Sequence, residues 1–247
     1  MAVAKYLTEF IGTFFLVLTI GLVVTQTGDQ GAIVNALAIG SALMIMVYMG
    51  GHVSGGHYNP AVTLAATMRG ACKIADVIPY WIAQVGGAIA AAVVVSIIVP
   101  AGVADAAASG TADVVAATPN FFGPAPGEGH SVTSPGPWLV EILFTFALAL
   151  VVLQTATSSG TSGNSFYGLA IGFTVVVGAY AGGGISGGAF NPAVGIGPNL
   201  IKGTMGGDPS AMGNFLLHIA GPMAGGALAA IVFKLQEAYV VSQKEND

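Results

Sequence analysis

The chain has 247 residues, of which 54% are hydrophobic and 7% charged, and its formal net charge is -5. So apolar a sequence has too little polar surface to cover a water-soluble globule of this size, which excludes a soluble protein and places the chain in a lipid bilayer. Its six Lys and Arg residues leave no basic surface for nucleic acid, and its single cysteine, Cys72, excludes a disulfide framework and a Cys-based metal site.

Six long apolar stretches are candidate membrane spans, because their lengths approach or reach the roughly 20 residues that a helix needs to cross the hydrocarbon core. The first contains Glu9 and is not a removable signal segment, since a counterpart containing Glu141 begins near residue 139. An acid inside a span costs roughly 3 kcal/mol unless it has a partner, so both glutamates need a role. The spans cover approximately residues 7–24, 32–49, 77–99, 138–157, 166–181 and 215–233.

A second kind of element follows the second span, where a glycine-rich run from Gly50 leads to an Asn-Pro-Ala motif and a short apolar helix ending near Met68. The same arrangement recurs from Gly182 to Ile201. Asn caps the free amides of a helix and Pro suits its first position, so each motif begins a helix that is too short to span. The motif residues are Asn59, Pro60 and Ala61 in one copy and Asn191, Pro192 and Ala193 in the other.

The motifs belong to an internal repeat. A shift of 132 residues aligns Glu9 with Glu141 and residues 54–62 with 186–194 without a gap, and residues 85–88 resemble 224–227 at a larger offset. Since each half contains three spans, the second half enters the membrane from the opposite side, and the repeat is inverted. The expected organisation is a single transmembrane domain over residues 1–247, with repeats at approximately 1–100 and 137–236 and an external loop at 101–136.

Short helices that enter from opposite faces meet tip to tip near the midplane, with their positive N-terminal ends together. The nonhelical backbone before each motif is acceptable at that depth only where its carbonyl groups face water or protein donors. A water-filled pore meets this requirement. The expected pore carbonyls are those of Gly55, Gly56, His57, Gly187, Gly188 and Ala189.

These motifs together resemble the aquaporins of the major intrinsic protein family over nearly the whole chain. The residues that carry the resemblance are 9–14, 51–63 and 186–193. It implies an all-α membrane protein with six transmembrane helices and two re-entrant half-helices in an inverted repeat. It also implies a homotetramer with one pore per subunit, passive flow of water or small uncharged solutes, and a scaffold role for Glu9 and Glu141, each accepting hydrogen bonds from one re-entrant loop.

The resemblance also implies where the pore is narrowest. Most family members have Arg three residues after the second motif asparagine, and strict water channels add an aromatic residue and a His. This chain has Val194 there, so it resembles a prokaryotic-type member with valine in place of the filter arginine. A wider, more apolar ring is expected to pass glycerol, urea, ammonia and hydrogen peroxide as well as water, while protons and ions are excluded. The four ring positions transfer to Ile39, Ala179, Gly188 and Val194.

The distribution of cations predicts the orientation. If the chain crosses six times, five of its six Lys and Arg residues fall on the side of the termini. By the positive-inside rule both termini are cytoplasmic in a multi-pass protein of the cell membrane. The five are Lys5, Arg69, Lys73, Lys234 and Lys244, and the exception is Lys202.

Other classes of function are weaker interpretations. An ion channel or coupled secondary transporter also uses inverted repeats and broken helices, but the spans contain no charge beyond the two repeat-related glutamates. Residues 184–188 match a Gly-x-Ser-x-Gly elbow, yet no strand precedes them and no acid and His follow in order, so no enzyme is expected. Neither a metal nor a cofactor is expected from the scattered histidines, which are His52, His57, His130 and His218.

Overall fold

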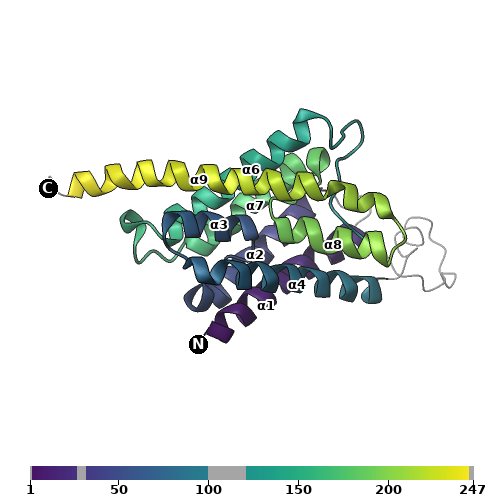
Figure 1. The fold of residues 1–247 in the computed structure, drawn as a ribbon, viewed down its shortest axis with the longest axis horizontal. Helices are drawn as coiled ribbons and strands as arrows, with labels where there is room; N and C mark the ends of the chain where they lie inside the picture. The colour runs from purple at the N-terminus through teal and green to yellow at the C-terminus, as the bar shows by residue number, and fades with distance from the viewer. Residues whose placement is uncertain (1, 27–31, 100–120, 245–247) are drawn as a thin grey trace.

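The computed structural model describes residues 2–26, 32–99 and 121–244, and all regular structure in these ranges is helical (Figure 1). The all-α fold class is therefore confirmed. The first half contains α1 (Ala2–Gln26), α2 (Ala32–Ser54), α3 (Pro60–Arg69) and α4 (Ile74–Ile98). The second contains α6 (Pro135–Ala156), η1 (Ser159–Thr161), α7 (Tyr167–Ser186), α8 (Pro192–Thr204), η2 (Pro209–Asn214) and α9 (Phe215–Lys244).

Six helices in the described ranges are long and apolar enough to cross a membrane, and they coincide with the six predicted spans. Their outward faces carry large exposed apolar side chains, such as Ile74 and Ile97. Such side chains are favourable in contact with lipid and unfavourable in contact with water. The two remaining helices, α3 and α8, have 10 and 13 residues and are too short to span. The chain is thus a multi-pass membrane protein.

The helices before the two motifs extend beyond the predicted spans. The spans were expected to end near residues 49 and 181, but α2 continues to Ser54 and α7 to Ser186, so the residues expected to be nonhelical, 55–57 and 187–189, follow these helices directly. Glycine weakens a helix by about 1 kcal/mol, whereas a backbone group without a partner costs several kcal/mol in hydrocarbon, so the helix persists. α7 ends where Gly187 adopts a φ of 90°, a left-handed conformation that suits glycine.

The two halves meet along α2 and α7, which pack against each other. A methyl group on Gly172 would lie 2.5 Å from the Gly40 carbonyl oxygen, and one on Gly40 would lie 2.5 Å from that of Gly172. These glycines are mates in the repeat, so the contact is reciprocal, as expected where a pseudo-two-fold axis passes between the helices. Within the halves, α1 packs on α4 and α6 packs on α9 in the same way.

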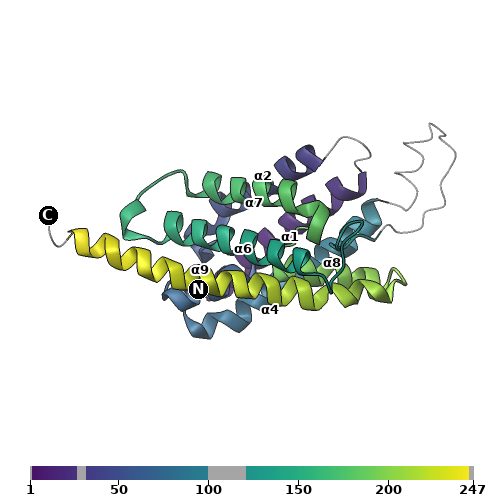
Figure 2. The same cartoon turned by 90° about the horizontal axis from the view of Figure 1, so that it is seen from above.

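Each short helix inserts into the opposite half. α3 packs chiefly against α9, and α8 packs chiefly against α4. Glycine allows the approach, since a methyl group on Gly226 would lie 2.5 Å from the Ala61 carbonyl oxygen. Figures 1 and 2 show both chain ends at one end of the bundle and the α8–η2 turn at the other. We call the first the terminal end and the second the distal end.

The third helices of the two halves match with a register that differs by one residue from the sequence comparison. Gly87 faces the Phe10 carbonyl oxygen, and Gly225 faces that of Ile142, the repeat mate of Phe10. Gly87 is therefore equivalent to Gly225, whereas the sequence comparison paired it with Gly226. Gly221 is also a packing residue, since a methyl group there would lie 2.8 Å from Glu141 Cβ.

The predicted external loop is described only from residue 121. Residues 121–134 contain no helix and run along the distal end of the bundle. The side-chain amide of Asn199, on α8, donates to the Pro124 carbonyl at 2.9 Å and fixes this segment. Asp105 and Asp113, which were expected in this loop, lie outside the described residues.

Candidate functional site

The site is built on the first turns of α3 and α8. Asn59 has an extended backbone, and its side-chain oxygen accepts from the amide of Ala61 at 2.8 Å. Asn191 caps α8 in the same way, accepting from Ala193 at 2.9 Å. Proline follows each asparagine at the first helical position, where no amide hydrogen is needed. Each Asn-Pro-Ala motif therefore caps and begins a helix through local interactions alone.

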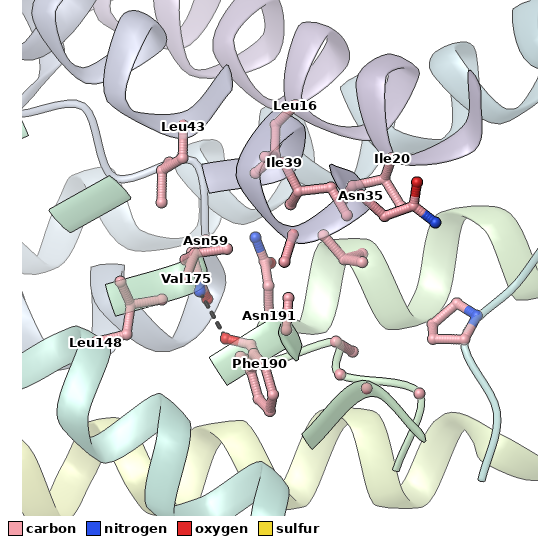
Figure 3. Close-up of a pocket in the computed structure, with 18 of the residues that line it drawn as sticks. Leu16, Ile20, Asn35, Ile39, Leu43, Asn59, Leu148, Val175, Phe190 and Asn191 are labelled. Atoms are coloured by element: carbon pink, nitrogen blue, oxygen red, sulfur yellow. Dashed lines mark hydrogen bonds between the residues drawn. The ribbon is translucent and has the colours of Figure 1, made fainter. Parts of the chain in front are cut away.

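The same two carboxamides join the halves. The Asn59 side-chain nitrogen donates to the Phe190 carbonyl at 2.9 Å (Figure 3). The Asn191 side-chain nitrogen donates to the Tyr58 carbonyl at 2.8 Å. Both asparagines line a cavity of about 490 Å³. Because a carboxamide carries two N–H groups, each asparagine retains a second donor in addition to this cross-link.

A buried carboxylate lies behind each nonhelical loop. Glu9 accepts from the Ser54 hydroxyl at 2.6 Å and from the amides of His57 and Tyr58 at 3.0 and 2.7 Å. Tyr58 has a φ of 49°, which is uncommon for a bulky residue and costs about 1–3 kcal/mol. The Glu9 carboxylate accepts a hydrogen bond from the Tyr58 amide and so stabilises this conformation of the loop.

Glu141 repeats this arrangement in the second half. It accepts from the Ser186 hydroxyl at 2.7 Å and from the amides of Ala189 and Phe190 at 3.0 and 2.7 Å. Phe190 has a φ of 46°, matching its repeat mate Tyr58. Both glutamate side chains are completely buried. The donors to each glutamate include two backbone amides and a serine hydroxyl, so neither acid is left without partners in the bundle.

Sequence reasoning missed the polar residues that complete the first half of this network. The Gln84 side-chain amide donates to Glu9 at 2.8 Å and to the Thr63 hydroxyl at 2.9 Å. Thr63 also lies 3.1 Å from His57 Nδ1. A glutamine within an otherwise apolar span was the available signal, because an intramembrane polar group needs a partner.

The second half uses a histidine in the equivalent place. The Tyr80 hydroxyl donates to the Ser54 carbonyl at 2.7 Å, and Nε2 of His218 lies 2.8 Å from the Ser186 carbonyl oxygen. His218 is completely buried and packs over Gly195. It contacts the carbonyl of Ser186 rather than its hydroxyl, which donates to Glu141, so the geometry is not that of a hydrolase nucleophile and base.

The histidines do not converge. His57 and His218 lie in opposite halves of the bundle, and His52 and His130 are exposed. No group of three or more His, Cys, Asp or Glu residues within the described ranges has the arrangement of a metal site.

The cavity contains all four predicted ring positions. Ile39 comes from α2, Ala179 from α7, Gly188 from the loop before α8 and Val194 from α8 itself. Of the six residues expected to present carbonyl groups, Gly55 alone lies outside this cavity. It lines a second cavity, at the terminal end, which shares His57 and Val152 with the first. The two cavities therefore meet near the helix tips.

Several lining residues were not anticipated. Asn35 lies one helical turn before Ile39 on the same helix and also lines the cavity (Figure 3). The segment from Phe122 to Ala125 enters the wall from the predicted loop, and Lys202 enters it from the end of α8. A single sequence contains no signal for these positions, because their placement depends on how distant segments pack.

The fold and the cavity define a multi-pass membrane channel in which two inverted halves enclose a path at their interface. The profile of the major intrinsic protein family matches residues 1–233. The chain belongs to the major intrinsic protein family, whose members are channels rather than enzymes, and it is a channel for water and small solutes.

Individual relatives are similar over most of their length. The chain is 37% identical to the glycerol uptake facilitator protein-like 6 of Lactiplantibacillus plantarum, covering 92% of this chain and 94% of that protein. It is 36% identical to aquaporin NIP1-3 of Oryza sativa subsp. japonica, covering 94% and 73%. The crystal structure of the aquaglyceroporin from Plasmodium falciparum has the same fold, with a TM-score of 0.77, 20% identity and coverage of 94% and 96%.

Proposed function

We propose that the chain is a passive channel whose solutes include glycerol, urea, ammonia and hydrogen peroxide as well as water. The observation that carries this proposal is the shared cavity of Ile39, Ala179, Gly188 and Val194, the four predicted ring positions. These four residues line one cavity, and none has a charged or aromatic side chain. A ring of small and aliphatic side chains is wider than one that contains an arginine, and it admits solutes with a carbon framework.

The polar groups of the cavity support passage of solutes with hydroxyl or amide groups. The second N–H groups of Asn59 and Asn191 are donors at the helix tips. The backbone carbonyl groups of Gly187 and Gly188, which line the same cavity, are the proposed acceptors. A polyol that crosses the apolar ring therefore exchanges hydrogen bonds with water for hydrogen bonds with these groups. The relative named as a glycerol uptake facilitator favours glycerol among these solutes.

Protons and ions are excluded in this proposal by the helix tips. α3 and α8 meet with their positive N-terminal ends together, which opposes a cation at that point. Donors from both asparagines orient the oxygen of one passing water, so it cannot accept from its neighbours in the file. The acids buried within the described helices, Glu9 and Glu141, are engaged with serine and backbone donors as scaffold residues. They supply no ring of charge along the path, which favours a channel for neutral solutes over an ion channel or coupled transporter.

The arginine substitution Val194→Arg tests the solute range. Reconstituted in proteoliposomes, the wild-type chain is expected to conduct water, glycerol and urea in stopped-flow light scattering. The variant is expected to lose glycerol and urea flux first, because a long charged side chain fills the ring. Val194→Ala serves as the matched control and should retain all three fluxes. Glycerol and urea flux no higher than in empty vesicles for the wild type would overturn the proposed range.

The assembly and orientation complete the proposal. A homotetramer with one pore per subunit is favoured by family membership. Cytoplasmic termini in the cell membrane are favoured by the distribution of cations, since Lys5, Arg69, Lys73 and Lys234 fall on the side of the termini in a chain that crosses six times. The whole chain acts as one domain in this proposal, because the path lies between the halves and neither half encloses it alone.

A further inference from the structure

One charged side chain lines the cavity of about 490 Å³ within the described part of the chain. It belongs to Lys202, in the last turn of α8. Eight residues separate it from Val194, which corresponds to about 12 Å along a helix, so it lies toward the distal entrance from the ring. No other Lys or Arg in the sequence belongs to the distal end. The side chain of Lys202 is 33% exposed, so it borders both cavity and solvent.

Two acids of the described residues lie at the same end as Lys202, since Glu128 belongs to the segment before α6 and Asp208 follows α8. Acidic groups around an entrance raise the local concentration of cations. A pore whose ring has no charge therefore excludes cations at this end only if another group supplies a positive charge there.

The turn after α8 holds Lys202 in place. The amide of Asp208 donates to the Lys202 carbonyl at 3.3 Å, and the Asp208 carboxylate lies 3.5 Å from the Lys202 ammonium group. Hydrogen bonding from Ser210, together with the charge of Lys202, holds the pKa of Asp208 below its usual value. The aspartate thus remains charged and orients the ammonium group at neutral pH.

We propose that Lys202 is a specificity-determining residue, whose ammonium group supplies at the distal entrance the positive charge that the Val194 ring lacks. This inference rests on the proposed channel function and adds a second barrier to cations, separate from the helix tips. Uncharged solutes do not respond to the barrier, whereas alkali cations and protonated amines do. Asp208 is a positioning residue, which holds the ammonium group beside the cavity.

A purely structural role for Lys202 makes different predictions. A cation in the last turn of a helix stabilises that helix by interacting with its dipole. Such a role would affect unfolding and leave ion selectivity unchanged. An electrostatic barrier instead depends on ionic strength, because the Debye length falls from about 30 Å at 0.01 M salt to about 3 Å at 1 M.

The test uses the full-length protein with Lys202→Glu, Lys202→Met and Lys202→Arg. Potassium conductance is measured in voltage-clamped planar bilayers in 10 mM and 1 M KCl, per amount of reconstituted protein. Lys202→Glu is expected to raise the conductance about three- to tenfold in 10 mM KCl, with a smaller rise for Lys202→Met and none for Lys202→Arg. The rise should disappear in 1 M KCl. Lys234→Met, which removes an exposed lysine at the terminal end, is the matched control.

Equal conductance for Lys202→Glu and wild type in 10 mM KCl would overturn the inference, including the case in which neither conducts. A rise of the same size in Lys234→Met, or one that persists in 1 M KCl, would overturn it as well. Water and glycerol flux are measured on the same preparations, and flux above that of empty vesicles shows that each variant is folded and open. Absence of glycerol flux in the wild type would count against the proposed solute range. The comparison of potassium conductance between wild type and variants would still test the role of Lys202.

Discussion

At the scale of single residues, the two motif asparagines each use one carboxamide for several contacts. The oxygen of Asn59 begins α3, and one N–H holds the opposite loop through Phe190. Asn191 does the same toward Tyr58. Aspartate would cap as well but would lack the donors, and glutamine would be one carbon too long for the cap. The paired geometry therefore accounts for asparagine at both positions.

The buried glutamates are not equivalent in what they accept, and this leads to a prediction. Oε2 of Glu9 accepts from both Tyr58 and Gln84, whereas Oε2 of Glu141 accepts from Phe190 alone. A Gln substitution turns one acceptor oxygen into a donor. Since each buried donor left unpaired costs about 1–3 kcal/mol, Glu9→Gln should destabilise by about 2–5 kcal/mol and Glu141→Gln by about 1–3 kcal/mol.

Thermal unfolding in detergent, followed by tryptophan fluorescence, measures this difference. Glu237→Gln is the control, because Glu237 also accepts from a serine and a backbone amide but lies near the terminal end, away from both motifs. It should change the midpoint least. A midpoint for Glu141→Gln below that of Glu9→Gln would contradict the assigned hydrogen bonds.

At the scale of elements, the helix contacts depend on glycines that face the backbone of a neighbouring helix. The α2–α7 contact has Gly40 and Gly172 facing each other, and the third helix of each half approaches the first through Gly87 or Gly225. Small residues allow such close packing where lipid removes the hydrophobic drive for helix association. The high glycine content thus serves helix packing as well as the nonhelical loops.

The Gly172→Ala substitution tests the α2–α7 contact. The new methyl group would lie 2.5 Å from the Gly40 carbonyl oxygen and 2.7 Å from Met44 Cβ, so the helices must separate. A loss of about 1–3 kcal/mol is expected from overpacking. Gly184→Ala on the same helix is the control, since its methyl group would meet nothing within 4 Å and alanine favours a helix. Equal thermal midpoints for the two variants would refute this account of the contact.

At the scale of the whole molecule, the inverted repeat places chemically similar groups on opposite sides of one path. Two half-helices, two capping asparagines and two glutamates meet between the halves, and two-fold symmetry brings both helix tips to one point. The symmetry is incomplete where side chains differ. Gln84 and Thr63 enlarge the polar network of the first half, while His218 over Gly195 serves the second.

The orientation of the molecule can be tested by labelling. In a Cys72→Ala background, Ser131→Cys lies in the segment between the repeats and Ser242→Cys near the end of α9, and both positions are exposed. A membrane-impermeant maleimide added to intact cells is expected to label residue 131 only, and permeabilised cells should label both. Labelling of residue 242 in intact cells would reverse the proposed orientation.

The sequence by itself determined the spans, the inverted repeat and the starts of α3 and α8. Hydrophobic length depends on composition alone, and a cap joins residues only two positions apart, as Asn59 and Ala61 show. The family also follows from these motifs. The ends of α2 and α7 lie beyond the predicted span ends, because glycine-rich runs remain helical when a bilayer supplies no other partner for their backbone.

The tertiary structure alone decided which distant groups meet. The cross-link from Asn59 to Phe190 joins residues 131 positions apart, and the contact of Gln84 with Glu9 joins residues 75 apart. The register of the third helices and the entry of Lys202 into the cavity belong to the same class. Such contacts depend on how helices pack around a shared axis, and a pattern within one segment contains no information about the segment that it will face.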